Sequence, residues 1–178
     1  MSGIREHLGE TMIWSQPRLF QHEYELHVGD RLVGSLRWGG AFRSIAIGEL
    51  AGRQWTFRRS GFFCSQVTVC AADSTADSAV FRADWKGGGA AQFRGGRRYQ
   101  WSRSGFWRSS NAFSSDTGEV LLTVSPRYRL MRFYARARVE PHAASGTDLD
   151  LLALLSGYLL VQAVDNGAVA AVVAMAVI

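Results

Sequence analysis

The sequence is poor in cysteine, proline and lysine. Its 178 residues include two Cys, three Pro and one lysine, Lys86. Two cysteines are too few for the disulfide framework of a small secreted domain, and no Cys-x-x-Cys pair suggests a zinc or thioredoxin-like site. Three prolines beside 19 glycines exclude a proline-rich or collagen-like chain.

The two cysteines, Cys64 and Cys70, lie six residues apart in an apolar run. Residues an even number apart on a strand face the same side, so we expect two buried free thiols. No apolar segment follows the charged residues of Met1–Glu10, which argues against a secretory signal. A reducing, cytoplasmic location fits both observations.

Arginine dominates the charge of the chain. It supplies 19 of the 20 basic residues, against 15 acidic ones, and the formal net charge is +5. Such a balance favours an anionic partner: a nucleic acid, an anionic lipid or a phosphorylated ligand. A GC-rich genome would enrich arginine in the same way, so the net charge does not choose among these partners.

From Gln21 to about Val139 the chain has the pattern of many short strands. Tyr24, Leu26 and Val28 alternate with polar residues before a Gly-Asp turn, and similar segments recur about every ten residues. No helical pattern interrupts them, so the spacing predicts an antiparallel sandwich or closed barrel rather than a parallel α/β sheet. Further strands are expected at 31–38, around 45–47, and at 54–59, 66–71, 79–85, 90–94, 98–103, 118–125 and 128–139.

One segment occurs twice, 44 residues apart. Trp55–Phe63 and Tyr99–Trp107 both alternate aromatic residues, then continue with Ser-Gly and two more aromatics. We interpret each copy as a strand ended by a tight turn, in which Gly61 and Gly105 supply the special backbone angle and the aromatics fill the core. Two copies of such a unit favour a barrel over a propeller.

The pattern changes after Gly146. Thr147–Asp150 resembles a helix-capping box, Leu151–Val164 is almost entirely apolar, and Asp165–Gly167 predicts the end of a helix. A helix that is apolar on every face either spans a membrane or is buried on all sides. The apolar stretch is shorter than the roughly 20 residues that a bilayer needs, and extending it would place Asp165 in lipid at a cost of about 2.5–3.5 kcal/mol. Residues 168–178 are expected to form a second short helix or a strand.

The apolar helix after the last strand, the duplicated aromatic units and the Tyr24–Trp38 hairpin resemble the tubby C-terminal-like superfamily. Its members include the tubby domain, the phospholipid scramblases and the LURP-one-related proteins of plants and bacteria, and this chain looks like a bacterial LURP-one-related or scramblase-like member. The resemblance, over roughly Pro17 to Asn166, implies an all-β fold with one helix. That fold is a closed antiparallel barrel of about twelve strands around a buried apolar C-terminal helix.

This resemblance also implies a domain organisation. We expect an N-terminal extension over residues 1–16 and a barrel domain over 17–166. The barrel domain would include a central helix at 148–164, and an apolar tail over 167–178 would follow it.

The functions known in the superfamily transfer only in general terms. Tubby domains bind phosphoinositide head groups through a basic surface cluster, and scramblases carry a palmitoylated cysteine run and an acidic calcium segment beside the helix. This sequence lacks the cysteine run, and Asp148, Asp150 and Asp165 are too scattered for a calcium loop. The resemblance therefore implies lipid binding without naming the residues that would do it.

No residue pattern indicates catalysis, a cofactor or a metal site. His22 and His27 are five residues apart, whereas the zinc-protease motif needs two histidines four apart on a helix. Residues five apart on a strand face opposite sides, so these two cannot share a metal. Gly-x-Ser-x-Gly is absent, and Lys86 precedes three glycines instead of following a phosphate-binding loop. We therefore expect a protein that is not an enzyme and has no cofactor.

The first of two basic features is Arg94–Trp101, which mixes arginines with aromatics. This composition is typical of single-stranded nucleic-acid sites. However, Tyr99 and Trp101 correspond to Trp55 and Phe57 in the other copy of the repeat. The correspondence favours a Gly-Gly turn whose aromatic residues point inward.

The second basic feature is one face of the last predicted strand. Residues at alternate positions are basic or aromatic on one side and apolar on the other, as in a barrel wall with a solvated outside. With two arginines just before it, this face is the candidate site for phosphate or another anionic group. The candidate residues are Arg127, Arg129, Arg132, Arg136 and Arg138, with Tyr134 on the same face.

Three functional hypotheses follow. The charge, the arginine row and the resemblance favour a cytoplasmic, non-enzymatic module that binds anionic lipid or a phosphorylated ligand peripherally at a membrane. One alternative is an RNA- or single-stranded-DNA-binding barrel that uses Arg94–Trp101. The other is a tail-anchored membrane protein that uses Leu151–Ile178.

Overall fold

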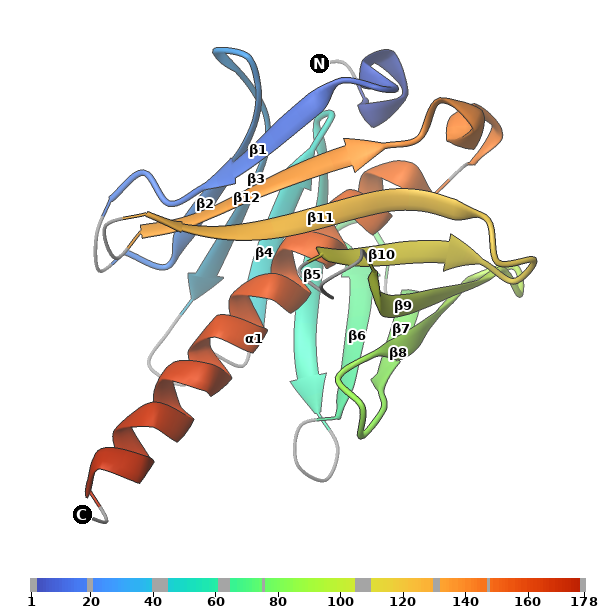
Figure 1. Cartoon of the computed structure of the whole chain (residues 1–178). Coiled ribbons are helices and arrows are strands. Elements are labelled where there is room, and N and C mark those ends of the chain that lie inside the picture. Colours follow the sequence, from blue (N-terminus) through green and yellow to red (C-terminus); the bar gives the residue numbers. More distant parts are fainter. Residues whose placement is uncertain are drawn as a thin grey trace.

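Twelve antiparallel strands close into a barrel, and one long helix runs through it (Figure 1). The computed structural model describes residues 3–18, 21–39, 45–60, 65–74, 76–104, 110–129, 132–146 and 148–176. Side chains are described for all of these except 104, 128, 129, 132, 145 and 166–176. The fold class expected from the sequence is confirmed.

Each strand pairs with the next one in the sequence, and β1 closes the ring by pairing with β12. The strands are β1 (Thr11–Ser15), β2 (Glu23–Val28), β3 (Arg31–Gly39), β4 (Ile45–Leu50), β5 (Arg53–Ser60), β6 (Gln66–Ala71), β7 (Asp77–Ala83), β8 (Gly89–Phe93), β9 (Arg98–Ser104), β10 (Ser110–Ser115), β11 (Val120–Arg129) and β12 (Arg132–Val139). The helices among the described residues are the short 3-10 turns η1 (Ile4–His7) and η3 (Pro141–Ser145) and the α-helix α1 (Leu149–Ala176).

The interior of the barrel is filled by α1 and by every second residue of the strands. The α1 residues from Leu151 to Tyr158 are all buried. Tyr158 stacks between two strand residues, with ring centroids 5.4 Å from Trp38 and 5.1 Å from Phe57. A helix with no polar face thus finds an apolar surface on every side, and its burial removes the need for lipid.

Consecutive hairpins turn at alternate ends of the barrel, so each end carries its own set of turns and helix ends. We call the end where α1 begins the base; it also holds η1, η3 and the β8–β9 turn, in which Gly95 and Gly96 have φ angles of 94° and 87°. We call the other end, where α1 leaves the barrel, the mouth. In Figure 1 the last turns of α1 extend beyond the strands to the C-terminus. The β7–β8 and β11–β12 hairpins turn at the mouth.

Two expectations about the ends of the barrel domain were wrong. Residues 1–16 are not an extension before the barrel, because Thr11–Ser15 forms β1 and buries Met12 and Trp14 between β12 and β2. The helix does not stop at Asp165–Gly167 but continues to Ala176, so the expected separate tail is part of α1. The residues after Gly167 are alanine, valine and methionine, which sustain a helix once it has started.

The strand boundaries near the end of the barrel also differ from those expected. Ser110–Ser115 forms β10, which its serine-rich sequence concealed. Pro126 does not end a strand; it lies within β11, opposite Ala135 of β12. As a result β11 extends to Arg129 and pairs with β12 from Leu122 to Arg129.

Cys70 is not a buried thiol as expected. It lies on the outward, partly exposed side of β6 and donates a hydrogen bond to Asp77 Oδ1 at 3.3 Å. Partial burial, together with this hydrogen bond, raises the pKa of the Cys70 thiol above its usual range. Cys64, Gly61 and Gly105 lie outside the described residues, so the expectations made for them are not addressed.

Candidate ligand-binding site

Three of the five arginines predicted from the sequence lie on the outer wall of the barrel, over β11 and β12. Arg136 and Arg138 are exposed on β12, where they alternate with the buried Ala135 and Ala137, and Arg127 is exposed on β11. We call Arg127, Arg136 and Arg138 the arginine face. The backbone register pairs Arg129 with Arg132 at the mouth end of the same two strands; their side chains lie outside the described set.

The arginine face has neutral neighbours across the strands. Arg136 lies between Ser125 of β11 and Ile13 of β1, and Arg138 lies between Thr123 and Thr11. Arg127 lies opposite Tyr134. Within the described part of the chain, none of the three guanidinium groups forms an ion pair or a hydrogen bond.

Two other surface arginines, in contrast, lie close to acids. Arg37 on β3 lies 4.0 Å from Glu23 and 3.9 Å from Glu49, and Arg97 pairs with Asp148 at 2.6 Å. The arginine face is therefore a strip of positive charge that the fold leaves available to an external anion.

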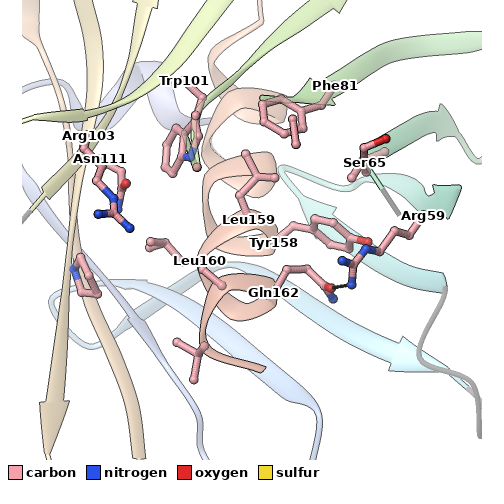
Figure 2. A pocket seen from close by; sticks show the side chains of 17 residues that line it. Arg59, Ser65, Phe81, Trp101, Arg103, Asn111, Tyr158, Leu159, Leu160 and Gln162 are labelled. Atoms are coloured by element: carbon pink, nitrogen blue, oxygen red, sulfur yellow. Dashed lines mark hydrogen bonds between the residues drawn. The ribbon is translucent and has the colours of Figure 1, made fainter. Parts of the chain in front are cut away.

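A cavity of about 630 Å³ opens at the mouth, between α1 and the strands β5–β7 and β9–β11 (Figure 2). Much of its lining is apolar, with aromatic residues from the strands and leucines from α1. Volumes of roughly 300–1,000 Å³ are typical of small-molecule sites. The lining residues that bear on its chemistry are Phe81, Trp101, Leu159, Leu160, Arg59, Arg103, Asn111 and Gln162.

Two arginines face into this cavity because of the sequence repeat. Trp55, Phe57 and Arg59 follow one another at alternate positions on the inner side of β5. Tyr99, Trp101 and Arg103 do the same on β9, so Arg59 and Arg103 hold equivalent places. Figure 2 shows the two side chains approaching from opposite sides of the cavity. No acidic side chain is among the described residues that line it.

The two arginines have different surroundings. The Arg59 guanidinium donates a hydrogen bond to Gln162 Oε1 of α1 at 2.6 Å (Figure 2). Arg103 lies opposite Asn111 of β10 and makes no hydrogen bond or ion pair with the residues that the structure describes. Sequence reasoning missed this site, although the shared arginine at the same position of both repeat copies was a signal for it.

The fold can be compared with known proteins. No protein-family model and no curated protein matches the sequence. Among solved structures, the chain is similar to a LURP-one-related protein of Arabidopsis thaliana, with a TM-score of 0.55 and 8% sequence identity over 90% of this chain and 96% of that one. The two chains share a fold. A porin-like protein from Bacteroides uniformis has a TM-score of only 0.30 and 12% identity over 75% of this chain and 56% of its own, which is too weak a likeness to support an argument.

The shared barrel agrees with the fold that the tubby-like resemblance implied. The likeness between the two structures concerns the fold alone. At 8% identity, residue roles do not carry over from one chain to the other. Any functional conclusion must therefore rest on the arginine face, the cavity and the ends of this barrel itself.

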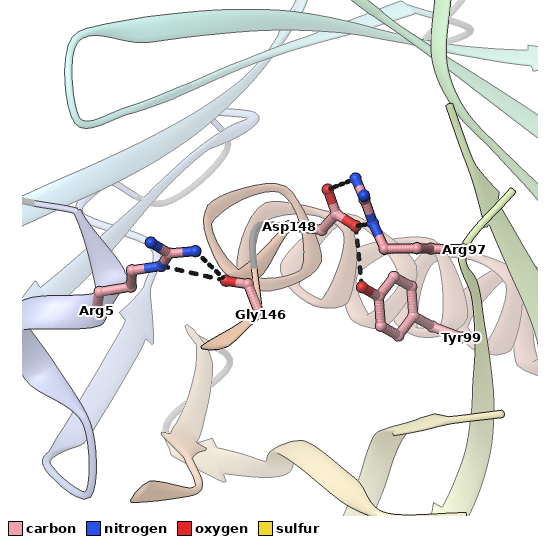
Figure 3. A network of polar contacts seen from close by, with 5 residues as sticks. All are labelled: Arg5, Arg97, Tyr99, Gly146 and Asp148. Carbon is pink, nitrogen blue, oxygen red and sulfur yellow. Dashed lines mark hydrogen bonds and ion pairs between the residues drawn. The ribbon is translucent and has the colours of Figure 1, made fainter. Parts of the chain in front are cut away.

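The segment Arg94–Trp101 is a turn with inward aromatics. Tyr99 and Trp101 are buried, so neither ring of this segment is available for stacking on a base. The Arg97 Nε donates to Asp148 Oδ2 at 2.6 Å, and the Tyr99 hydroxyl donates to the same oxygen at 2.9 Å (Figure 3). These contacts hold the start of α1 against the base, and the Asp148 carboxylate also lies at the favourable end of the helix dipole.

A second contact holds the base from the N-terminal side. Arg5 of η1 donates to the carbonyl oxygen of Gly146 at 2.8 Å, and the backbone N–H of Ile4 donates to Asp150 Oδ1 at 2.8 Å. These hydrogen bonds tie η1 to the start of α1 at the base, whereas the cavity opens at the mouth.

Neither a metal site nor a membrane-crossing helix is found in the described part of the chain. No three His, Cys, Asp or Glu side chains of the described residues gather as metal ligands would. His27 instead pairs with Glu25, with 2.9 Å between Nε2 and Oε2. No described helix combines the length and the apolar character needed to cross a bilayer.

Proposed function

We propose that this protein is a non-enzymatic barrel module that binds anionic membrane surfaces peripherally. The observation that carries the proposal is the arginine face, in which Arg127, Arg136 and Arg138 stand exposed on two paired strands without an acidic partner among the described residues. Guanidinium groups bind lipid phosphates through paired hydrogen bonds, and each basic residue near an anionic surface contributes about 1 kcal/mol.

Two features at the mouth support a membrane rather than a dissolved ligand. Trp85, in the β7–β8 hairpin, is 89% exposed, and Lys86 lies over its ring at 5.0 Å. The end of α1 leaves the barrel at the same end, and its residues Ala168–Ala176 are all Ala, Val or Met. Tryptophan next to a basic side chain is typical of the membrane interface, and an apolar helix end can enter the headgroup region without crossing the bilayer.

Vesicle sedimentation tests the proposal. The full chain should sediment with vesicles that contain phosphatidylserine and remain in the supernatant with pure phosphatidylcholine, and added salt should weaken the binding. Arg136→Gln/Arg138→Gln removes two charges from the arginine face, which at about 2 kcal/mol corresponds to an affinity roughly 30-fold lower.

The matched control removes two exposed arginines from the opposite side of the barrel. Arg53→Gln/Arg94→Gln, at the base ends of β5 and β8 and away from Trp85, has the same net charge as the test variant. It should lose no more than a few-fold in affinity. Equal losses from the two double variants, or equal binding to neutral vesicles, would overturn the proposal. So would glycerol phosphate binding to the protein as tightly as the vesicles do.

A further inference from the structure

The cavity at the mouth combines a cation with an apolar lining, and the arginine face plays no part in it. We propose that this cavity binds a single-chain anionic amphiphile: one carboxylate or phosphate group on an alkyl chain. Arg103 would hold the anionic group, and the apolar wall between the strands and α1 would cover the chain. This inference concerns the inner side of the barrel and goes beyond membrane binding by its outer side.

Arg103 is the residue that selects an anion. It occupies an inward-facing position at the end of β9, directly after the buried Trp101 on the same side. Its guanidinium has no ion pair or hydrogen bond within the described part of the chain, and no described acid lines the cavity. Arg103 is exposed at the rim of the cavity, so an anion can reach its guanidinium from solvent, and the adjoining apolar wall lowers the water screening of the pair on one side.

The amide of Asn111 completes a place for the anionic group. Asn111 pairs with Arg103 across β9 and β10 and also lines the cavity. Its amide N–H₂ can donate to an oxygen that the guanidinium already holds, so a carboxylate or phosphate finds donors from two strands.

Arg59 has a different role despite its equivalent place in the repeat. Its hydrogen bond to Gln162 ties β5 to α1 where the helix leaves the barrel. We therefore expect Arg59 to position the helix wall of the cavity and Arg103 to bind the ligand.

The remaining lining suits an alkyl chain. Trp101 and Phe81 contribute ring surface from the strands, while Leu159 and Leu160 contribute methyl groups from α1. The volume of about 630 Å³ is far larger than a water molecule needs, and an apolar space of this kind gains free energy when a chain replaces solvent. An amphiphile fits because the cationic and apolar parts of the lining adjoin each other.

Isothermal titration with dodecyl phosphate and dodecanoate, both below their micelle concentrations, tests the proposal. Each should bind the full chain with a stoichiometry of one. Dodecanol, which lacks the charge, and inorganic phosphate, which lacks the chain, should each bind at least tenfold more weakly. No binding of either amphiphile, or binding of inorganic phosphate with equal affinity, would overturn the proposal.

Two variants locate the binding site. Arg103→Gln should weaken dodecyl phosphate at least tenfold, whereas Arg58→Gln, one strand position from Arg59 on the outer side of β5, should leave it unchanged within about twofold. Ala163→Trp fills the cavity from an exposed position on α1 and should block the chain while both arginines remain. Wild-type affinity in both Arg103→Gln and Ala163→Trp would contradict this site, and circular dichroism checks that both variants are folded.

The two proposals fail independently. Arg103→Gln should still bind phosphatidylserine vesicles, and Arg136→Gln/Arg138→Gln should still bind dodecyl phosphate. If either Arg103→Gln or Arg136→Gln/Arg138→Gln lost binding to both vesicles and dodecyl phosphate, the cavity would not be a site separate from the arginine face. The inference about the cavity would then be wrong, while the proposal of membrane binding would stand.

Discussion

At Gly157, α1 packs directly against Trp14 of the barrel wall. A Cβ atom there would lie 2.6 Å from Trp14 Cε2, and the Trp14 ring is completely buried. Gly157→Ala therefore forces a rigid ring to move. We expect the free energy of unfolding to fall by about 1–3 kcal/mol, although alanine is the better helix former. Urea unfolding followed by circular dichroism measures this loss.

Gly39→Ala is the control for that substitution. A Cβ added at Gly39, at the end of β3, meets nothing within 4 Å. Its effect should stay within about 0.5 kcal/mol. A Gly157→Ala protein as stable as the control would show that α1 and β1 pack less tightly than the geometry indicates.

Tyr99 should make the free energy of unfolding fall as the pH rises through the alkaline range. Burial, followed by the hydrogen bond to Asp148, raises the pKa of the Tyr99 hydroxyl from 10.0 to about 12. A raised pKa means that the folded state holds the proton more tightly than the unfolded state does. The stabilisation is complete below pH 10 and is lost as the pH rises towards 12. Urea titrations at several pH values should show a decline over this range that is smaller in Tyr99→Phe.

Tyr134→Phe provides the comparison for Tyr99. Tyr134 is half-buried on the outer side of β12, where it takes no part in the contacts at the base. The Tyr134→Phe protein should keep the alkaline decline of the wild type. If it lost the decline while Tyr99→Phe kept it, the assignment to Tyr99 would be refuted.

At the scale of elements, α1 has two parts with different roles. Among its described side chains the last buried one is Val161, and the helix then continues beyond the strands. A chain that stops after Asp165 keeps every side chain that the structure describes as buried in α1, so we expect its free energy of unfolding to stay within about 1 kcal/mol of the full chain. Its affinity for phosphatidylserine vesicles should fall, as measured by sedimentation.

A chain that stops after Ser156 is the contrasting truncation. It lacks Tyr158 and Val161, so the rings of Trp38 and Phe57 lose the partner between them. We expect this chain to lose cooperative unfolding. Equal stability of the two truncated chains would mean that the barrel does not depend on the middle of α1.

The helix also shows what the sequence can and cannot predict about an element. Its apolar character on all faces predicts burial on all sides, and the capping pattern Thr147–Asp150 predicts a start at residue 148, one residue before the observed start at Leu149. Its end was misplaced because Asp165–Gly167 resembles a stop, whereas a helix already held inside a barrel passes through one unfavourable glycine at a cost of about 1 kcal/mol. Local signals weigh less once tertiary packing has fixed the element.

Strands that carry few apolar residues were missed for a related reason. Ser110–Ser115 buries only Ala112 and Phe113, and it is identified as β10 by its neighbours β9 and β11 rather than by its own pattern. The cavity was missed because its lining converges only when β5, β9 and α1 meet. The outward faces of Arg136 and Arg138 were predicted correctly because alternation along a single strand is enough to assign a residue to a face.

At the scale of the whole molecule, β1 decides whether the barrel is closed. It pairs with both β12 and β2, and it buries Met12 and Trp14. Deleting residues 1–16 would leave two unpaired strand edges and an exposed core, so we expect aggregation and the loss of a cooperative transition. Size-exclusion chromatography and thermal unfolding measure the outcome.

Ile13→Thr is the matched change on the outer side of β1. Ile13 points away from the core, between Arg136 and His27. This variant should remain monomeric and lose less than about 1 kcal/mol. A deletion protein that stayed monomeric with an unchanged midpoint would show that β1 is dispensable after all.

The position of α1 also fixes the order in which this protein can be built. The helix that fills the barrel follows all twelve strands in the sequence, so the wall is synthesised before its core. Until Tyr158 has left the ribosome, the inner faces of the strands have nothing to pack against, and β1 can meet β12 only after all twelve strands have been made. Folding must therefore wait until α1 has been synthesised, and a message cut short within α1 would yield a sheet with an exposed apolar face, a substrate for chaperones and proteases.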